Sequence, residues 1–190
     1  GTNFTVFYAG NGEGDIKSNN ILSLCLDSSV RLWTGTECGL GYYENGRFHQ
    51  YSNTVYNPST QILELSEDLV VGMGKDGPIS FRKDDINNAV GRYYATGASW
   101  ITNALVSREG ELWLPRAADD DCSIDILDSS LQRLEEVRLG RDLSINAMAE
   151  QPSNTIWVAT SRGLRCFSSL SHTPLPVPEV LGGLTGRRRI

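Results

Sequence analysis

Few side chains in this sequence are suited to chemistry, and those that are lie far apart. The chain of 190 residues has two histidines, His49 and His172, and neither has an obvious acid or nucleophile as a partner. No nucleophile elbow, zinc-protease helix, phosphate-binding loop or dinucleotide fingerprint occurs. The sequence therefore predicts a protein that is not an enzyme and that holds no cofactor.

Two acidic segments carry the oxygen ligands that hard cations prefer. Asn11–Asp15 is rich in glycine but lacks the ligand pattern of a calcium-binding loop, so a flexible loop is favoured over a Ca²⁺ site. Asp119, Asp120 and Asp121 would point in alternating directions along an extended chain, so they cannot all converge on one ion. A solvated turn is favoured there, and no metal site is predicted.

The cysteine pattern does not resemble a zinc site. Cys25, Cys38, Cys122 and Cys166 include no closely spaced pair. An even number of cysteines would permit disulfides in an oxidising compartment. Because Cys25 and Cys166 lie in apolar stretches, small buried thiols are favoured.

Composition excludes several classes of protein. The net charge of −6 disfavours nucleic acid as a partner, and the basic cluster Arg187–Arg189 is interpreted as a solvated tail. Apolar runs such as Ile21–Leu26 are too short for a membrane helix. Gly1 and Thr2 do not begin a secretory signal peptide, which leaves the compartment open.

Self-similarity is the strongest signal in the sequence. An isoleucine precedes a tryptophan by 12 residues in three units, which pair Ile21 with Trp33, Ile101 with Trp113, and Ile145 with Trp157. A degenerate unit begins at Ile62, with Val70 in place of the tryptophan. The starting isoleucines are 41, 39 and 44 residues apart. A period of about 40 residues carried by short alternating segments is typical of β-propeller blades.

The first unit shows how one blade is built. Four strands are expected over residues 21–27, 30–36, 40–44 and 47–51. Asn45-Gly46 suits a two-residue type I′ hairpin between the last two strands, because both residues tolerate positive φ. In the third unit, Pro115 is expected to shorten the second strand, because proline cannot donate to a ladder.

We therefore predict an all-β chain that forms a partial β-propeller of about four blades, each a four-stranded antiparallel sheet. Residues 1–20 would supply the last strand of a preceding blade, over Phe4–Tyr8, and a linker. The blades would follow at 21–60, 61–100 (degenerate), 101–144 and 145–170 (partial), with an irregular, proline-containing tail at 171–190. Regular spacing inside apolar strands favours packing between blades over ligand stacking for the repeated tryptophans.

The unit resembles the two-component regulator propeller repeat. Its pattern is Ile-x-x-Leu, a spacer, and Leu-Trp-x-Gly-Thr-x-x-Gly-Leu before an aromatic-rich strand, and the best matches are residues 21–51 and 154–167. The resemblance implies that the chain is part of the periplasmic sensor region of a hybrid two-component histidine kinase. Such a sensor binds oligosaccharides and signals through a membrane protein. Two alternatives stay open, a propeller scaffold for protein–protein interaction and, with less support from two isolated histidines, a lyase-type propeller enzyme.

A carbohydrate contact is expected where planar polar and aromatic side chains gather between blades. Arg92, Tyr93, Tyr94 and Trp100 lie at the end of the second unit and in the segment that enters the third. Such segments lie at a propeller face, and sugars stack on aromatic rings there. The alternative is that Tyr93 and Trp100 pack inside the blade interface.

Four blades are too few to close a seven-bladed ring, so the open blades would expose unpaired strands and apolar faces. We therefore expect the chain to form a homodimer through its open blade edges, or to adopt a small ring of four to five blades.

Overall fold

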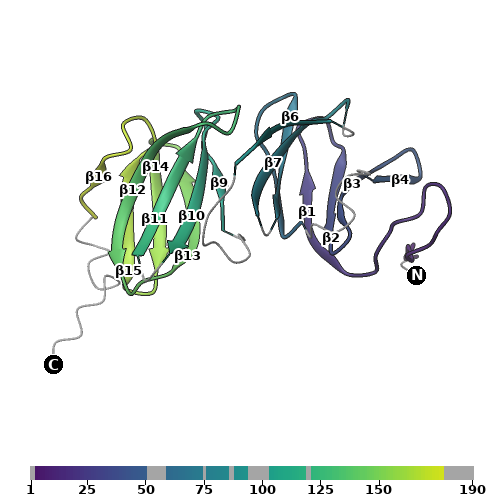
Figure 1. The fold of residues 1–190 in the computed structure, drawn as a ribbon, viewed down its shortest axis with the longest axis horizontal. Coiled ribbons are helices and arrows are strands. Elements are labelled where there is room, and N and C mark those ends of the chain that lie inside the picture. Colours follow the sequence, from purple (N-terminus) through teal and green to yellow (C-terminus); the bar gives the residue numbers. More distant parts are fainter. Residues whose placement is uncertain are drawn as a thin grey trace. The chain divides into compact units, whose positions relative to one another are not determined.

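The described part of the computed structural model is all-β. It covers residues 3–50, 59–74, 76–85, 88–93, 103–118 and 121–177, and within these ranges the regular structure is β-strand. The strands form four separate four-stranded antiparallel sheets, each in simple sequential order (Figure 1). The predicted fold class, a partial β-propeller of four-stranded blades, is confirmed.

The first two blades belong to one compact unit, residues 1–94. Blade 1 comprises β1 (Ile21–Leu26), β2 (Leu32–Thr36), β3 (Gly39–Glu44) and β4 (Arg47–Gln50). Blade 2 comprises β5 (Gln61–Glu64), β6 (Leu69–Gly74), β7 (Gly77–Arg82) and β8 (Ala89–Arg92). The predicted turn after β3 is confirmed, since φ is 51° at Asn45 and 81° at Gly46.

The other two blades belong to a second compact unit, residues 95–190. Blade 3 comprises β9 (Leu105–Val106), β10 (Leu112–Ala118), β11 (Asp121–Leu127) and β12 (Arg133–Arg141). Blade 4 comprises β13 (Ile145–Gln151), β14 (Thr155–Thr160), β15 (Gly163–Ser168) and β16 (Pro174–Leu175). The short β16 pairs with β15 inside the segment predicted to be an irregular tail.

Pro115 does not shorten its strand, contrary to the prediction. It lies inside β10 and pairs with Ile124 of β11. Within the described residues, β9 pairs only with Leu112 and Trp113, so Pro115 lies beyond the reach of that neighbour. The missing N–H therefore costs no ladder hydrogen bond, as for proline at a sheet edge.

Each unit has an apolar core between its two blades. The face of blade 2 that packs on blade 1 carries Ile62, Val70 and Phe81. The face of blade 4 that packs on blade 3 carries Ile156, Val158 and Phe167. We call this the upstream face, and the opposite face of a blade its downstream face. Trp33 and Trp113 lie on the downstream faces of blades 1 and 3 and are both 0% exposed. The prediction that these two indoles pack between blades is confirmed.

Strand pairing corrects the repeat alignment in blade 2. Glu64 pairs with Val70 across β5 and β6, just as Leu26 pairs with Leu32 and Glu150 with Ile156. Val70 therefore corresponds to the residue before each tryptophan, and Val71 occupies the tryptophan position. Val70 accordingly faces Trp33 across the unit 1 core.

Trp157 differs from the other two repeat tryptophans. It is half-buried, whereas Trp33 and Trp113 are covered by the following blade. No blade follows blade 4 among the described residues, so nothing described covers the downstream face that carries Trp157. That this indole packs between blades stays a prediction.

The N-terminal segment forms no strand within the described residues 3–10. Phe7 instead packs on two rings of blade 1, with centroid distances of 5.3 Å to Tyr43 and 5.2 Å to Phe48. The partner strands that Phe4–Tyr8 would need as the last strand of a preceding blade are not among the described residues. That assignment stays a prediction.

Candidate functional site

The predicted carbohydrate patch is described only in part. Arg92 is the exposed last residue of β8, and Tyr93 is half-buried and donates its backbone N–H to the Pro78 carbonyl at 3.1 Å. Tyr94 and Trp100 lie outside the described residues. The patch of four residues therefore stays a prediction.

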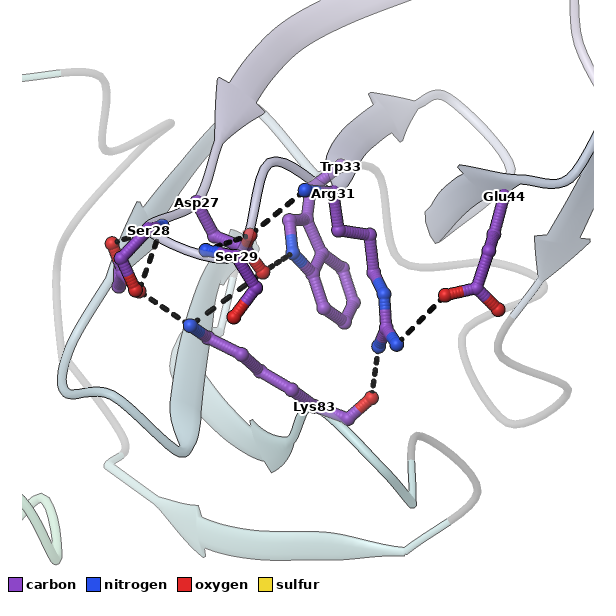
Figure 2. Close-up of polar contacts among 8 residues, drawn as sticks. Asp27, Ser28, Ser29, Arg31, Trp33, Glu44 and Lys83 are labelled. Atoms are coloured by element: carbon purple, nitrogen blue, oxygen red, sulfur yellow. Dashed lines mark hydrogen bonds and ion pairs between the residues drawn. The ribbon is translucent and has the colours of Figure 1, made fainter.

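The most elaborate polar site is a cluster between blades 1 and 2 (Figure 2). Asp27, in the turn after β1, accepts hydrogen bonds of 2.9 Å from the Trp33 indole N–H and from the backbone N–H groups of Ser29 and Arg31. Its side chain is 0% exposed. A short polar residue that binds its own turn is typical of an Asx-turn.

Lys83 brings an ammonium group from blade 2 into this turn. Its Nζ lies 3.5 Å from Asp27 Oδ2 and also contacts Glu64 Oε1, which belongs to β5. Glu64 accepts a further 2.6 Å hydrogen bond from the Ser28 hydroxyl and one of 3.0 Å from the Ser28 backbone N–H. We call Asp27, Glu64 and Lys83 the charged cluster. Charges of blade 2 are thus tied directly to the turn of blade 1.

Arg31 closes the other side of the site. Its guanidinium donates to the backbone carbonyl of Lys83 and, at 3.0 Å, to Glu44 Oε1. Its central carbon also lies 4.6 Å from the centroid of the Tyr42 ring. Arg31 therefore lies at the edge of the cluster near Trp33 and links the two blades.

The electrostatics of the charged cluster favour fixed ionised groups. Burial by itself raises the pKa of Asp27, but the hydrogen bonds from Trp33 and Arg31 and the Lys83 charge outweigh it, so the pKa lies below its ordinary value. Burial likewise opposes ionisation of Glu64, yet the bonds from Lys83 and Ser28 hold its pKa low. Carboxylates held in this way join blades. They are not poised to exchange protons at neutral pH.

Sequence reasoning missed this cluster, although part of it had a local signal. An acceptor lies six residues before a tryptophan in two units, since Trp157 Nε1 donates to Gln151 Oε1 at 3.0 Å just as Trp33 does to Asp27. The contributions of Glu64 and Lys83 depend on how the blades pack. No local spacing reveals them.

His172 forms a second polar site, between blades 3 and 4. Its Nε2 lies 2.9 Å from Glu111 Oε2 and its Nδ1 lies 2.8 Å from Glu135 Oε2. The ring also meets the Trp113 indole edge-on, with centroids 5.6 Å apart. The interpretation of His172 as a histidine without an acidic partner is wrong, because its partners lie 61 and 37 residues away in sequence.

Protonation of His172 is expected to stabilise unit 2. Burial alone would lower its pKa, but the hydrogen bonds and charges of Glu135 and Glu111 raise it above the ordinary value. A raised folded-state pKa gives stability that is complete below the unfolded-state pKa of about 6.5 and is lost as pH rises through the folded-state value. Urea denaturation of the wild type should therefore show a falling free energy of unfolding across that window.

His172→Asn should remove this pH dependence and cost about 1–3 kcal/mol at the acidic end, where the charged hydrogen bonds are present. Asparagine is chosen because residue 172 has a φ of 55°, which asparagine tolerates. His49→Gln is the matched control, since His49 stacks on Tyr42 in blade 1. An unchanged pH slope in His172→Asn would contradict the assignment.

The acidic loop over Asn11–Asp15 is closed by its own side chains. Lys17 Nζ donates to the Gly12 carbonyl at 2.8 Å and to the Gly10 carbonyl at 3.4 Å, while Asp15 accepts the Gly12 N–H at 2.8 Å. Asp119 and Asp120 lie outside the described residues. In the described part of the chain, no group of three His, Cys, Asp or Glu side chains is placed to hold a metal ion.

The four cysteines are free thiols in this structure. Cys122 and Cys166 are buried, while Cys25 and Cys38 are half-buried. Burial raises the pKa of Cys25, Cys122 and Cys166, which favours the protonated thiol over the more reactive thiolate.

The described residues thus define the class of the protein as a β-propeller of stacked four-stranded blades whose charged groups tie neighbouring blades together. Within the same residues, no helix is long and apolar enough to cross a membrane. No protein-family model matches the chain, and no curated protein matches it.

Solved structures share this fold at low sequence identity. The extracellular domain of BT3049 from B. thetaiotaomicron, a protein named as a hybrid two-component system, matches with a TM-score of 0.64 and 18% identity over 85% of this chain and 23% of that one. PorZ, a surface component of the type-IX secretion system of Porphyromonas gingivalis, matches with a TM-score of 0.64 and 13% identity over 97% of this chain and 31% of that one.

A propeller enzyme shares the fold as well. Virginiamycin B lyase from Staphylococcus aureus matches with a TM-score of 0.63 and 11% identity over 83% of this chain and 55% of that one. The chain therefore spans between about a quarter and about half of these proteins. The predicted resemblance to a sensor propeller is confirmed for the fold. The lyase and PorZ share this fold too, so the fold by itself does not distinguish their functions.

Proposed function

We propose that this chain is a blade-forming part of the extracytoplasmic sensor of a hybrid two-component system, located in the periplasm and acting by binding. The observation that carries the proposal is the likeness to the extracellular domain of BT3049 over 85% of the chain. It is supported by the repeat over residues 21–51, which resembles the two-component regulator propeller repeat.

The described side chains support binding rather than catalysis. Asp27, Glu64 and Lys83 hold blades 1 and 2 together, and His172 ties blade 4 to Glu111 and Glu135 of the same unit. Each of these charged groups already has its partners, so each acts in the scaffold. A propeller scaffold of this kind positions ligand contacts on the segments that connect its strands and blades.

The ligand class that we propose is an oligosaccharide, bound by Arg92, Tyr93, Tyr94 and Trp100. A planar guanidinium next to aromatic rings offers both hydrogen-bond donors and stacking surfaces. In the described part of this segment, Arg92 is exposed and is the last residue of β8.

The proposal predicts that a panel of purified oligosaccharides contains a ligand whose affinity falls about ten-fold or more in Arg92→Ala and in Trp100→Ala. Isothermal titration calorimetry measures the affinities. Arg82→Ala is the matched control, because Arg82 is an exposed arginine on the neighbouring strand β7. Unchanged affinity in both variants would exclude this patch as the binding site. A panel without a ligand would exclude oligosaccharides as the ligand class.

The sensor role has its own test. Sequencing the gene beyond the codons of this chain should reveal a membrane span followed by kinase and receiver domains. A downstream region without them would favour the scaffold alternative.

A further inference from the structure

The joint between blades 3 and 4, where their faces pack, repeats the turn that Asp27 forms in blade 1. Strand pairing aligns Trp113 with Trp33. Ser107, six residues before Trp113, therefore takes the place of Asp27, and both residues are 4% exposed. Its Oγ accepts the Glu111 backbone N–H at 3.3 Å, just as Asp27 Oδ1 accepts the corresponding N–H at 2.9 Å. The two turns are thus closed in the same way.

A serine has one side-chain oxygen where an aspartate has two. In blade 1 the second oxygen of Asp27 accepts the Trp33 indole N–H at 2.9 Å (Figure 2). In blade 3 the oxygen of Ser107 serves the turn, and the Trp113 indole N–H has no hydrogen-bond partner among the described residues. Trp113 is 0% exposed, so this donor is buried as well as unpaired. A buried donor without a partner costs the free energy of its desolvation.

Glu150 of blade 4, which meets this turn, is only half satisfied. It corresponds to Glu64 in strand pairing, and its Oε2 accepts the Arg108 backbone N–H at 2.7 Å. In the unit 1 joint, Glu64 Oε1 also accepts the Ser28 hydroxyl at 2.6 Å and contacts the Lys83 ammonium group. Glu150 Oε1 is buried and has no partner among the described residues.

Ser169 takes the place of Lys83 in this joint. Each follows the third strand of its blade and donates its backbone N–H to the residue before the second strand, Ser169 to Asn154 at 2.9 Å and Lys83 to Asp68 at 3.0 Å. Ser169 is 1% exposed, and its hydroxyl has no partner in the described part of the chain. Because serine is far shorter than lysine, it brings no ammonium group to Glu150.

The chemistry of these unpaired groups restricts what can bind between them. Asp27 Oδ2 and Lys83 Nζ lie 3.5 Å apart in unit 1 and bridge the indole to the Glu64 carboxylate. The corresponding bridge in unit 2 must accept from an indole at one end and donate to a carboxylate at the other. A metal or ammonium ion would suit Glu150 but cannot accept from the Trp113 N–H, and an anion would be repelled by Glu150. Water both accepts and donates, and buried waters typically bond to polar groups that lack other partners.

His172 does not supply the missing acceptor. Its ring meets Trp113 edge-on, with centroids 5.6 Å apart. Its Nε2 lies 2.9 Å from Glu111 and its Nδ1 lies 2.8 Å from Glu135, so both ring nitrogens are already engaged. The ring therefore packs on the indole without taking its N–H.

We propose that the joint between blades 3 and 4 binds a pair of hydrogen-bonded internal waters, at the places that the Asp27 carboxylate and the Lys83 ammonium group fill in unit 1. One water accepts from the Trp113 indole, and the other donates to Glu150 Oε1 and pairs with the Ser169 hydroxyl. All of these groups lie within unit 2, so the site does not depend on the proposed ligand. The two joints then differ in kind, since one is bridged by an ion pair and the other by water.

Nuclear magnetic resonance of the chain with ¹⁵N-labelled tryptophan tests the site, because a long-lived bound water gives a nuclear Overhauser effect to a proton that it contacts. The Trp113 indole proton should show a cross-peak with water. Trp33 is the matched control, since its N–H donates directly to Asp27 and should show none. Trp113→Phe assigns the signal. A missing cross-peak at Trp113 would overturn the proposal, as would an ion or a protein acceptor at the indole in a high-resolution crystal structure.

Restoring the polar pair of unit 1 provides the second arm. The double variant Ser107→Asp/Ser169→Lys should lose the Trp113 cross-peak, because the new carboxylate accepts the indole N–H and the new ammonium group replaces the second water. Ser129→Asp/Ser171→Lys is the control, since it adds the same charges at exposed serines of unit 2 and should keep the cross-peak. A cross-peak that persists in the folded first variant would contradict the proposal. If that variant does not fold, the comparison of the two indoles in the wild type decides alone.

Discussion

Trp33→Ala is expected to lower the free energy of unfolding of unit 1 by about 3–5 kcal/mol. The indole is 0% exposed and belongs to a core that includes Ile62, Val70 and Phe81 of the next blade. Its loss leaves a cavity between two blades and removes one hydrogen bond from Asp27. Urea denaturation gives the free energy, and hydrogen exchange in β1 and β2 assigns the loss to unit 1.

Trp157→Ala supplies the matched control at the same position of the repeat. Because Trp157 is half-buried, its removal should cost only about 1–2 kcal/mol. Equal costs at the two positions would contradict the conclusion that blades 1 and 4 differ in what covers their indoles.

The blades themselves were predictable because their signals are local. Asn45 and Gly46 mark a hairpin through their own backbone preferences, and the isoleucine-to-tryptophan spacing reports two strands and the turn between them. The alignment failed in blade 2 because Val70 and Val71 are both buried, each on a different face of β6. Where both faces of a strand are buried, alternation no longer distinguishes them.

The polar sites were not predictable for a different reason. Lys83 meets Asp27 only after two blades have packed, and His172 reaches Glu111 across another joint of the same kind. Neither contact depends on the spacing of residues within one repeat. The Pro115 prediction failed in a related way, because the cost of a missing N–H depends on whether a neighbouring strand needs it.

The second large effect is expected from Lys83→Met, which removes the ammonium group but keeps an unbranched apolar side chain. The Asp27 side chain is 0% exposed and that of Glu64 is 26% exposed, so two carboxylates would face each other without their shared cation. Breaking a buried ion pair from one side costs about 3–5 kcal/mol. Urea denaturation at neutral pH measures this loss in unit 1.

Arg162→Met is the matched control for loss of a cation. Arg162 pairs with Asp142 at 3.7 Å, but the two side chains are 59% and 71% exposed. Solvent screens such a pair, so its removal should change stability by about 1 kcal/mol or less. A comparable cost for the two substitutions would show that burial does not strengthen the charged cluster.

The pH dependence separates loss of charge from loss of packing. The pKa values of Asp27 and Glu64 are lowered in the folded protein, so their contribution is present above the unfolded values of about 3.9 and 4.3 and is lost as pH falls. Once both carboxyls are protonated, Lys83 no longer has charged partners. The difference between wild type and Lys83→Met should therefore shrink as pH falls below about 4. A difference that stays constant from neutral to acidic pH would assign the cost to packing of the lysine stem and would contradict an electrostatic joint between the blades.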